Sequence, residues 1–294
     1  MNKIFITGAT GNIGKSVVKH LLNQTNQQLV VGVRNIEKSR KHFPSSQRLQ
    51  YQTFDFEAFD SNSTVFRGID LVFLLRPPHI SDVATYFKPI IESLVKSGVK
   101  KVVFLSVQGV EKSSIIPHHK IEKLILDSGL DYVFVRPSYF MQNLTTTFLD
   151  EIKAQKTVTV PAGKGIFNWV DVDNIGEATA QLINRFEEFK NRGYDITGTE
   201  NKSFGEVCSE LSKCIGCEIK FQSPSILRFF KLKKKEGMPN GFIVVMIMLH
   251  LLPRFQKPPT ISNHVNKLTG KKPTLLSEFF EREKNLFTKK PIEL

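Results

Sequence analysis

The sequence predicts an α/β protein with a Rossmann-type, doubly wound parallel sheet and a smaller, mostly helical C-terminal substrate domain. Three observations support this fold class. Short apolar runs alternate with stretches of helical periodicity through the first half, a glycine-rich loop follows the first run, and the alternation becomes irregular in the second half. Runs without a polar side indicate strands that helices cover on both faces, as in parallel sheets.

The first half alternates strands with helices. The expected strands are Lys3–Thr7, Leu29–Val33, Leu49–Thr53, Leu71–Leu75, Lys101–Ser106 and Tyr132–Val135. Amphipathic patterns between them predict helices over Ile13–Leu22, Val83–Val95 and Ile121–Leu126. Right-handed crossovers between such strands give a doubly wound sheet.

The glycine-rich loop joins the first strand to the first helix. It reads Gly8-Ala-Thr-Gly11-Asn-Ile-Gly14. Gly8 suits a tight turn, Gly11 lets the backbone approach a pyrophosphate, and Gly14 lets the helix pack closely on the strand. The helix N-terminus then offers free N–H groups to the anion. This strand–loop–helix context predicts a dinucleotide site.

The end of the second strand bears on the type of dinucleotide. Sites that prefer NAD hold an acidic residue there, whereas this chain has Arg34, and the nearest acid is Glu37. A guanidinium suits a 2′-phosphate, and Lys38 or Arg40 would add positive charge. We therefore expect NADP(H) as the preferred cofactor, with NAD(H) as the alternative. The other interpretation of Arg34 is an ordinary surface arginine.

The second half is expected to divide between two domains. Residues 1–150 would form the NAD(P)-binding domain, to which 167–198 return, and 151–294 the smaller substrate-covering region, chiefly 139–165 and 200–294. The patterns predict strands over Phe167–Val172 and Tyr194–Thr197, and helices over Asn174–Phe186, Ser203–Lys213 and Pro273–Phe287. The apolar run Phe242–Leu252 is too short to span a membrane. We predict a buried helix there, with contact to a membrane surface as the alternative.

Composition favours a soluble protein of a reducing compartment. The content is 40% hydrophobic and 23% charged, without a secretory signal, and we predict a cytoplasmic location. Cys208, Cys214 and Cys217 do not form a disulfide framework, and no metal site is expected. The net charge is +13, and residues 225–294 hold fourteen Lys and Arg against five Asp and Glu. Without a nucleic-acid motif, we interpret this charge as solvated surface.

The motifs also resemble a known family. The glycine loop resembles the GxxGxxG of short-chain dehydrogenases/reductases. Four further segments resemble the atypical, NmrA-like branch: 73–78 (FLLRPP), 135–143 (VRPSYFMQN), 167–178 (FNWVDVDNIGEA) and 268–273 (LTGKKP). That branch contains NAD(P)H:quinone oxidoreductases, triphenylmethane and azo-dye reductases, and redox-sensing regulators. The resemblance follows the chain in order over nearly its whole length.

The resemblance implies cofactor-binding residues at matching positions. Most would lie at carboxyl ends of strands, where doubly wound sheets bind ligands. They are Gly8, Thr10, Gly11, Asn12, Ile13 and Gly14 around the pyrophosphate, Arg34 and Lys38 at the 2′-phosphate, Asp55 and Phe56 at the adenine, and Leu74, Leu75, Arg76, Ser106, Lys123, Pro137 and Tyr139 nearer the nicotinamide. For Asp55 and Phe56, a strand-end turn without contact to the cofactor is an equal alternative.

The chain departs from the typical family pattern in its catalytic segment. Short-chain dehydrogenases carry Tyr-x-x-x-Lys after a serine, whereas Ser106 is followed here by His119 and Lys123 at that spacing. The candidate catalytic residues are His119, Lys123 and, one residue earlier, His118. We expect Lys120 and Lys123 to lower the histidine pKa values. For Lys123 we prefer contact with the ribose hydroxyls, and both histidines have a purely structural alternative.

The residues after the sixth strand are candidates for substrate contact. Tyr139, Phe140 and Asn143 would form the pocket wall, where an aromatic side chain can stack on a flat acceptor. Core packing is the favoured alternative for Phe140. We therefore predict an NADPH-dependent oxidoreductase that transfers hydride to a quinone or similar conjugated acceptor, with a protein partner or homodimer as further options. The alternative is a non-enzymatic NADP(H)-binding redox sensor of the NmrA type. A sugar-nucleotide isomerase is disfavoured because it needs the missing tyrosine.

Overall fold

The computed structural model describes residues 3–60 and 62–288, which fall into two compact units. Unit 1 consists of residues 1–137, 172–196 and 264–271. Unit 2 consists of residues 138–171, 197–263 and 272–294. The chain passes from one unit to the other five times, so neither unit is a single continuous segment.

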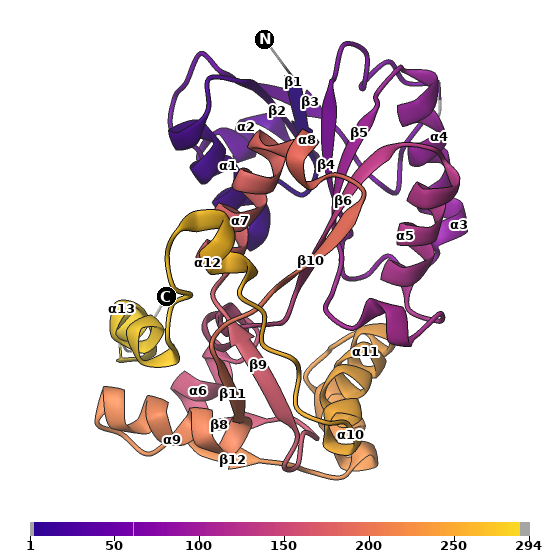
Figure 1. Cartoon of the computed structure of the whole chain (residues 1–294). Helices are drawn as coiled ribbons and strands as arrows, with labels where there is room; N and C mark the ends of the chain where they lie inside the picture. Colours follow the sequence, from indigo (N-terminus) through magenta and orange to yellow (C-terminus); the bar gives the residue numbers. More distant parts are fainter. Residues whose placement is uncertain (1–2, 61, 289–294) are drawn as a thin grey trace. The chain divides into compact units, whose positions relative to one another are not determined.

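A seven-stranded sheet forms the centre of unit 1, and all of its strand pairs are parallel (Figure 1). Its strand order is β3-β2-β1-β4-β5-β6-β10. The strands are β1 (Lys3–Ile6), β2 (Gln28–Val33), β3 (Leu49–Thr53), β4 (Leu71–Leu75), β5 (Lys101–Leu105), β6 (Asp131–Pro137) and β10 (Arg192–Ile196). This is the order of the dinucleotide-binding Rossmann fold with one added edge strand, and it confirms the predicted fold class.

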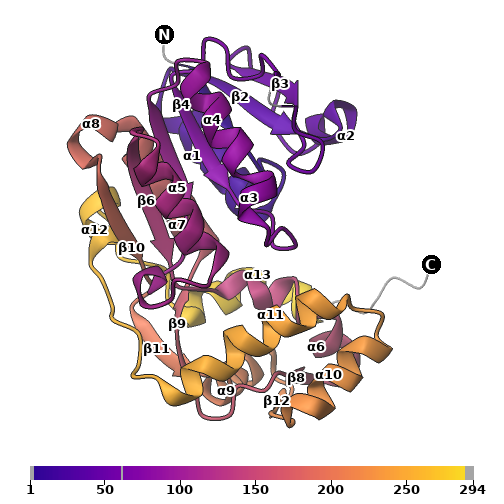
Figure 2. The ribbon, with the colours of Figure 1, turned by 90° about the vertical axis from the view of Figure 1, so that its right-hand side faces the viewer.

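Helices cover both faces of this sheet. One face carries α1 (Asn12–Gln24) and α7 (Val172–Asn184), which pack on each other, and α12 (His264–Thr269) packs on α7. The other face carries α3 (Val83–Tyr86), α4 (Lys88–Lys96) and α5 (Pro117–Asp127), which Figure 2 shows in front of the strands. The short helices α2 (Ile36–Arg40), η1 (Val110–Lys112) and α8 (Phe186–Phe189) complete the unit.

The single helix predicted over Val83–Val95 is two helices in the structure. The break falls at Phe87, and Pro89 lies in the first turn of α4. Proline has no N–H group, so it cannot donate to the carbonyl of Thr85 four residues earlier. The pattern of apolar residues continues across the break because both helices bury the same side against the sheet.

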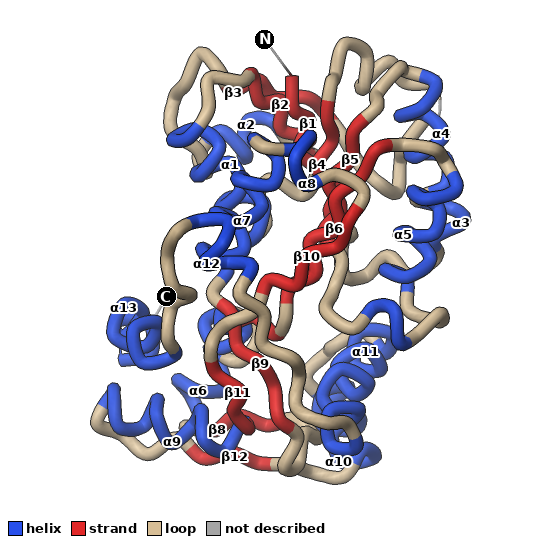
Figure 3. The backbone as a smooth tube through the Cα atoms, viewed as in Figure 1, coloured by secondary structure: helices blue, strands red, loops and turns tan. Residues whose placement is uncertain are grey.

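Unit 2 is built on two small sheets surrounded by helices, as Figure 3 shows by colour. One sheet has the order β7-β9-β11 and the other pairs β8 with β12. Its strands are β7 (Tyr139–Phe140), β8 (Thr157–Thr159), β9 (Ile166–Val170), β11 (Glu200–Ser203) and β12 (Lys220–Gln222). Its helices are η2 (Met141–Thr145), α6 (Leu149–Gln155), α9 (Phe204–Ile215), α10 (Ile226–Lys235), α11 (Asn240–Leu251), η3 (Leu252–Phe255) and α13 (Leu276–Thr288).

The prediction of a buried helix over Phe242–Leu252 is only half right. The helix exists as α11, and it buries Ile243, Met246, Ile247 and His250 on one face. Its opposite face is also apolar, yet it is 46–49% exposed. A sequence that is apolar all round cannot reveal which side the core covers.

Candidate functional site

The glycine loop forms a tight turn that brings α1 against the end of β1. Gly8 has a φ of +59°, a conformation that favours glycine, and the N–H of Gly11 donates to its carbonyl at 3.0 Å. A Cβ at Gly14 would lie 2.2 Å from the Gly8 carbonyl oxygen and 2.6 Å from the Cα of Ala9. The first turn of α1 can therefore reach the loop only because residue 14 has no side chain. Gly11, the N-cap, also lacks a side chain, so it leaves the free N–H groups of α1 uncapped.

Thr7 anchors this loop, and it was not among the residues selected from the sequence. Its buried hydroxyl donates to the carbonyl of Phe73 at 3.2 Å and accepts from the N–H of Leu75 at 2.8 Å. The bonds lock the ends of β1 and β4 together, and they bring Leu75 against the turn at Gly8. A threonine between a strand and a glycine has no signature that distinguishes it from an ordinary strand residue.

Arg34 lies immediately after β2 and is exposed, as is Lys38 in α2. The side chain of Asn35 caps α2 by accepting from the N–H of Lys38 at 2.9 Å. Glu37, the nearest acid, lies 3.9 Å from Arg40, whose guanidinium packs over Tyr51. Within the described part of the chain, no carboxylate forms an ion pair with Arg34. Both cations are thus accessible to an anion at this edge of the sheet.

The residues after β3 form the strand-end turn that was one of the two alternatives. Asp55 is half-buried, and its carboxylate accepts from the N–H of Glu57 at 3.1 Å. Phe56 is buried, and its ring packs edge-on against Phe54 and lies 5.3 Å from Phe87. The Phe56 side chain therefore belongs to the core, and a role at the adenine stays a prediction.

Arg76 organises the loop after β4. Leu74 is buried and Leu75 partly so, while the Arg76 guanidinium donates to the carbonyls of Pro77, Pro78 and Ile80 at 3.1, 3.1 and 2.5 Å. Its Nε also donates to Nε2 of His118 at 3.4 Å. Burial, and then the positive charge of Arg76, lower the pKa of His118 to about 3. The expected direction is right, but the cause is burial and Arg76 rather than Lys120 and Lys123.

Ser106 carries a buried hydroxyl at the carboxyl end of β5. Its N–H continues the ladder by donating to the carbonyl of Val135 at 2.7 Å. Its Oγ has no hydrogen-bond partner among the residues that the structure describes. Alternation along the strand puts Ser106 on the same face as Phe104, whose ring lies 6.1 Å from that of His118. A buried hydroxyl without a partner costs free energy, so this one is suited to a ligand.

His119 and Lys123 lie on the same side of α5, one turn apart. His119 donates from Nδ1 to the carbonyl of Val110 at 3.2 Å, because a carbonyl oxygen can only accept. Lys123 is 68% exposed and pairs with Asp127 at 3.0 Å. The helical spacing is therefore present, while contact of either side chain with cofactor or substrate stays a prediction.

Arg136 and Pro137 end β6. Arg136 forms a two-pronged ion pair with Glu122 of α5, at 3.0 and 2.7 Å, and a Cβ on Gly193 of β10 would clash with the guanidinium. The carbonyl of Pro137 accepts from the N–H of Gln108 at 2.9 Å. The ion pair with Glu122 holds α5 against the sheet, a role of Arg136 that the sequence motif did not indicate.

Tyr139 lies in an aromatic cluster of unit 2, and its partner is a histidine that the sequence analysis did not select. The hydroxyl of Tyr139 donates to Nε2 of His250 at 2.8 Å, since Nδ1 of His250 donates to the Met246 carbonyl at 2.7 Å. Burial lowers the pKa of His250 to about 4 and raises that of Tyr139 above its usual range. Phe140 and Asn143 are partly exposed nearby in the chain. His250 is far from Tyr139 in sequence, so only the fold brings them together.

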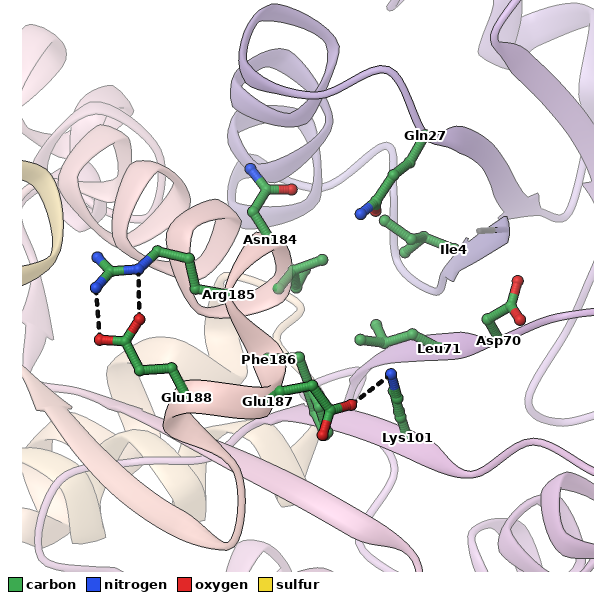
Figure 4. A pocket seen from close by; sticks show the side chains of 11 residues that line it. Ile4, Gln27, Asp70, Leu71, Lys101, Asn184, Arg185, Phe186, Glu187 and Glu188 are labelled. Carbon is green, nitrogen blue, oxygen red and sulfur yellow. Dashed lines mark hydrogen bonds and ion pairs between the residues drawn. The ribbon is translucent and has the colours of Figure 1, made fainter. Parts of the chain in front are cut away.

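A separate pocket of about 310 Å³ lies at the amino ends of β1, β4 and β5, at the opposite end of the strands from the glycine loop (Figure 4). Lys101 pairs there with Glu187 at 2.6 Å, and Arg185 pairs with Glu188 at 2.5 Å. Doubly wound sheets bind ligands at the carboxyl ends of their strands. This pocket is therefore not part of the candidate cofactor site.

The remaining sequence features are the three cysteines, possible metal ligands and the apolar runs. Cys208 is buried, Cys214 donates to Glu281 at 3.2 Å, and Cys217 is exposed. Across residues 3–60 and 62–288, no group of three or more His, Cys, Asp and Glu is arranged to hold a metal ion. Within the same ranges, no helix has the length and apolar character needed to cross a membrane.

Comparisons with known proteins place the chain in a family. Residues 1–280 match the model of the NmrA-like family. The prestalk A differentiation protein A of Dictyostelium discoideum is 29% identical over 98% of this chain and 96% of its own length, and the NAD(P)H azoreductase of Xenophilus azovorans is 25% identical over 94% and 96%. A solved structure of the NADPH-dependent quinone oxidoreductase QOR2 of Escherichia coli, complexed with NADPH, superposes with a TM-score of 0.83 at 22% identity and covers 96% of this chain and 100% of that one. The chain therefore belongs to the NmrA-like family.

Proposed function

We propose that this chain is an NAD(P)H-dependent oxidoreductase that prefers NADPH and transfers hydride to a quinone or a similar flat, conjugated acceptor. The observation that carries the proposal is the loop at Gly8–Gly14, where a Cβ on residue 14 would meet backbone at 2.2 Å. The relatives named as azoreductase and quinone oxidoreductase support the class of reaction.

The residues at the carboxyl edge of the sheet fit a dinucleotide. The free N–H groups of α1 suit a pyrophosphate beside Gly8, Thr10, Gly11, Asn12, Ile13 and Gly14. Arg34 and Lys38 are exposed cations suited to the 2′-phosphate. We assign Asp55 and Phe56, in the turn after β3, to the adenine. Leu74, Leu75 and Arg76 would lie along the cofactor. The Ser106 hydroxyl would form a hydrogen bond with the nicotinamide end of the cofactor.

A bound nicotinamide would supply a hydride, and reduction of a quinone to a quinol would need one further proton. His118 is a poor donor of that proton, because its pKa of about 3 leaves it uncharged at neutral pH. We assign the transfer of this proton to His119, since its Nδ1 holds the ring on the Val110 carbonyl and leaves Nε2 for contact with the acceptor. We assign Lys123 to the ribose hydroxyls, for which it must exchange or share its contact with Asp127.

The acceptor would contact the segment that continues from Pro137. Tyr139, Phe140 and Asn143 follow within six residues of the end of β6. The hydroxyl of Tyr139 is held by His250, so the contribution of Tyr139 is a fixed aromatic surface rather than a proton. The residues proposed for the cofactor up to Pro137 belong to unit 1, and Tyr139, Phe140 and Asn143 belong to unit 2.

Purified chain should oxidise NADPH in the presence of at least one member of a panel of benzoquinones, naphthoquinones, azo dyes and enals. The absorbance of NADPH reports the reaction. His119→Gln should reduce kcat by about a hundredfold if His119 transfers the proton, whereas His118→Gln should leave the pH profile unchanged. NADPH binding without turnover across the panel would refute the oxidoreductase and favour the redox sensor.

A further inference from the structure

The surface formed by α10 and α11 in unit 2 has a composition that the proposed activity does not explain. The two helices pack against each other, as Figures 1 and 2 both show. The outer face of α11 consists of Val244, Val245, Met248 and Leu249, and Leu252 extends it into η3. These five side chains are 44–49% exposed and are all apolar.

The helical period shows that this exposure belongs to one continuous face. The buried residues of α11 are spaced by three, one and three positions, which defines the side that packs on the core of unit 2. The exposed residues occupy the opposite side at positions i, i+1, i+4, i+5 and i+8. A solvent-facing side of a helix normally carries polar residues. Here the sequence replaces them with valine, methionine and leucine over two full turns.

Exposed cations lie on the helix before this apolar face and on the segment after it. The exposed surface of α10 carries Arg228, Lys231, Lys234 and Lys235, together with Leu227, which is 75% exposed. Arg254 and Lys257 follow α11, beside Phe255, which is 77% exposed. The fifth cation of α10, Lys233, is buried and paired with Glu151 and Glu236, so it serves the fold rather than the surface.

We propose that α10, α11 and η3 form an interfacial surface that binds the protein to an anionic lipid bilayer. Membrane-surface helices combine a wide apolar side with lysine and arginine at the level of the headgroups. A purely apolar face would bind any hydrophobic surface. The four exposed cations of α10 favour anionic headgroups, so the charge indicates an anionic bilayer as the partner. α11 has 12 residues, too few to cross the bilayer, so it lies in the interface.

Sedimentation of the full chain with lipid vesicles tests this surface. The chain should sediment with vesicles of equimolar phosphatidylcholine and phosphatidylglycerol, and not with phosphatidylcholine alone. The triple variant Lys231→Gln, Lys234→Gln, Lys235→Gln should bind about a hundredfold more weakly, since each cation near an anionic surface contributes about fivefold. Met248→Gln with Leu249→Gln should weaken binding at least about tenfold. Glutamine keeps a high helix propensity, so all these variants should fold.

Matched controls distinguish binding through this surface from nonspecific binding through charged or apolar side chains elsewhere on the protein. Lys41→Gln, Lys96→Gln, Lys112→Gln removes the same charge from exposed positions of unit 1, and Val95→Gln removes an apolar side chain that is 48% exposed on α4. Both should sediment like the parent chain. No binding to either vesicle, or equal binding by every variant, would overturn the proposal. So would a homodimer that Met248→Gln dissociates, because a second copy would then cover α11.

Discussion

Replacing Gly14 with alanine tests the packing on which the cofactor site depends. The new Cβ would lie 2.2 Å from the Gly8 carbonyl oxygen, and an ordinary contact begins at about 3.4 Å. The first turn of α1 must therefore move by about 1.2 Å, or the loop must open by that amount. The neighbouring atoms are backbone, so no flexible side chain can give way. Such overpacking costs about 1–3 kcal/mol, against which alanine regains about 1 kcal/mol of helix propensity.

The displacement should affect cofactor binding more than stability. A hydrogen bond to a phosphate that lengthens by about 1 Å is lost, and each one contributes about 1.5–3 kcal/mol. We expect the Kd for NADPH to rise at least about tenfold, while the free energy of unfolding falls by at most about 2 kcal/mol. Calorimetric titration with NADPH and urea unfolding measure the two quantities.

Gly205→Ala provides the matched control. Gly205 also lies in the first turn of a helix, α9, but a Cβ there meets nothing closer than 3.9 Å. This variant should keep the parent affinity for NADPH and be equally or slightly more stable. If Gly14→Ala binds NADPH like the parent chain, the close approach of α1 does not shape a pyrophosphate site, and the reasoning fails.

Three further predictions follow from other contacts. Arg34→Glu should weaken NADPH binding about 10-fold to 100-fold and NADH binding much less. Arg67→Glu, a change at another exposed arginine, should leave the binding of both nucleotides unchanged. If Arg34→Glu weakens the binding of both nucleotides equally, the role of Arg34 at the 2′-phosphate is refuted. Arg136→Met should lower the free energy of unfolding by about 3 kcal/mol, because it leaves the buried Glu122 carboxylate unpaired. Adding Glu122→Leu to this variant should recover part of the loss. If urea unfolding shows that the losses of the two single variants simply add in the double variant, the ion pair does not couple the two residues. His118 binds a proton in the unfolded chain near pH 6.5 and in the folded protein only near pH 3, so the free energy of unfolding should fall as the pH drops through this window. His118→Asn should flatten the slope by up to about 1.4 kcal/mol per pH unit, and an unchanged slope would show that the imidazole does not resist protonation in the folded protein.

The sequence was most informative where local rules and the fold coincide. β3 and β4 have the predicted bounds. The apolar run of β4 is almost entirely buried, whereas β3 lies at the edge of the sheet and is mostly exposed, and each run ends where the loop residues begin. The turn at Gly8 and the close packing at Gly14 were predictable, since steric freedom is a property of glycine itself. Helix breaks were less accessible: the stop at Phe87 depends on one missing N–H group within a continuous apolar pattern.

The parts that the sequence did not reveal depend on contacts across long stretches of chain. The bond between Tyr139 and His250 joins residues 111 positions apart, and the two-pronged pair of Arg136 with Glu122 joins a strand to a helix. The pKa of His118 depends on burial and on Arg76, which no spacing rule connects with α5. The exposed side of α11 was hidden for the opposite reason, because its two faces have the same chemistry.

The five crossings of the chain between the two units have a consequence for how the protein is made. Unit 1 cannot complete its sheet until β10 has been synthesised, and α12 joins it only with residues 264–271. In a nascent chain that ends at residue 150, the edge of β6 that normally pairs with β10 would be exposed and unpaired. Such an edge can pair with the wrong strand while the chain is still on the ribosome. Genetic dissection of this protein should therefore use point substitutions, since no single cut in the chain releases either unit intact.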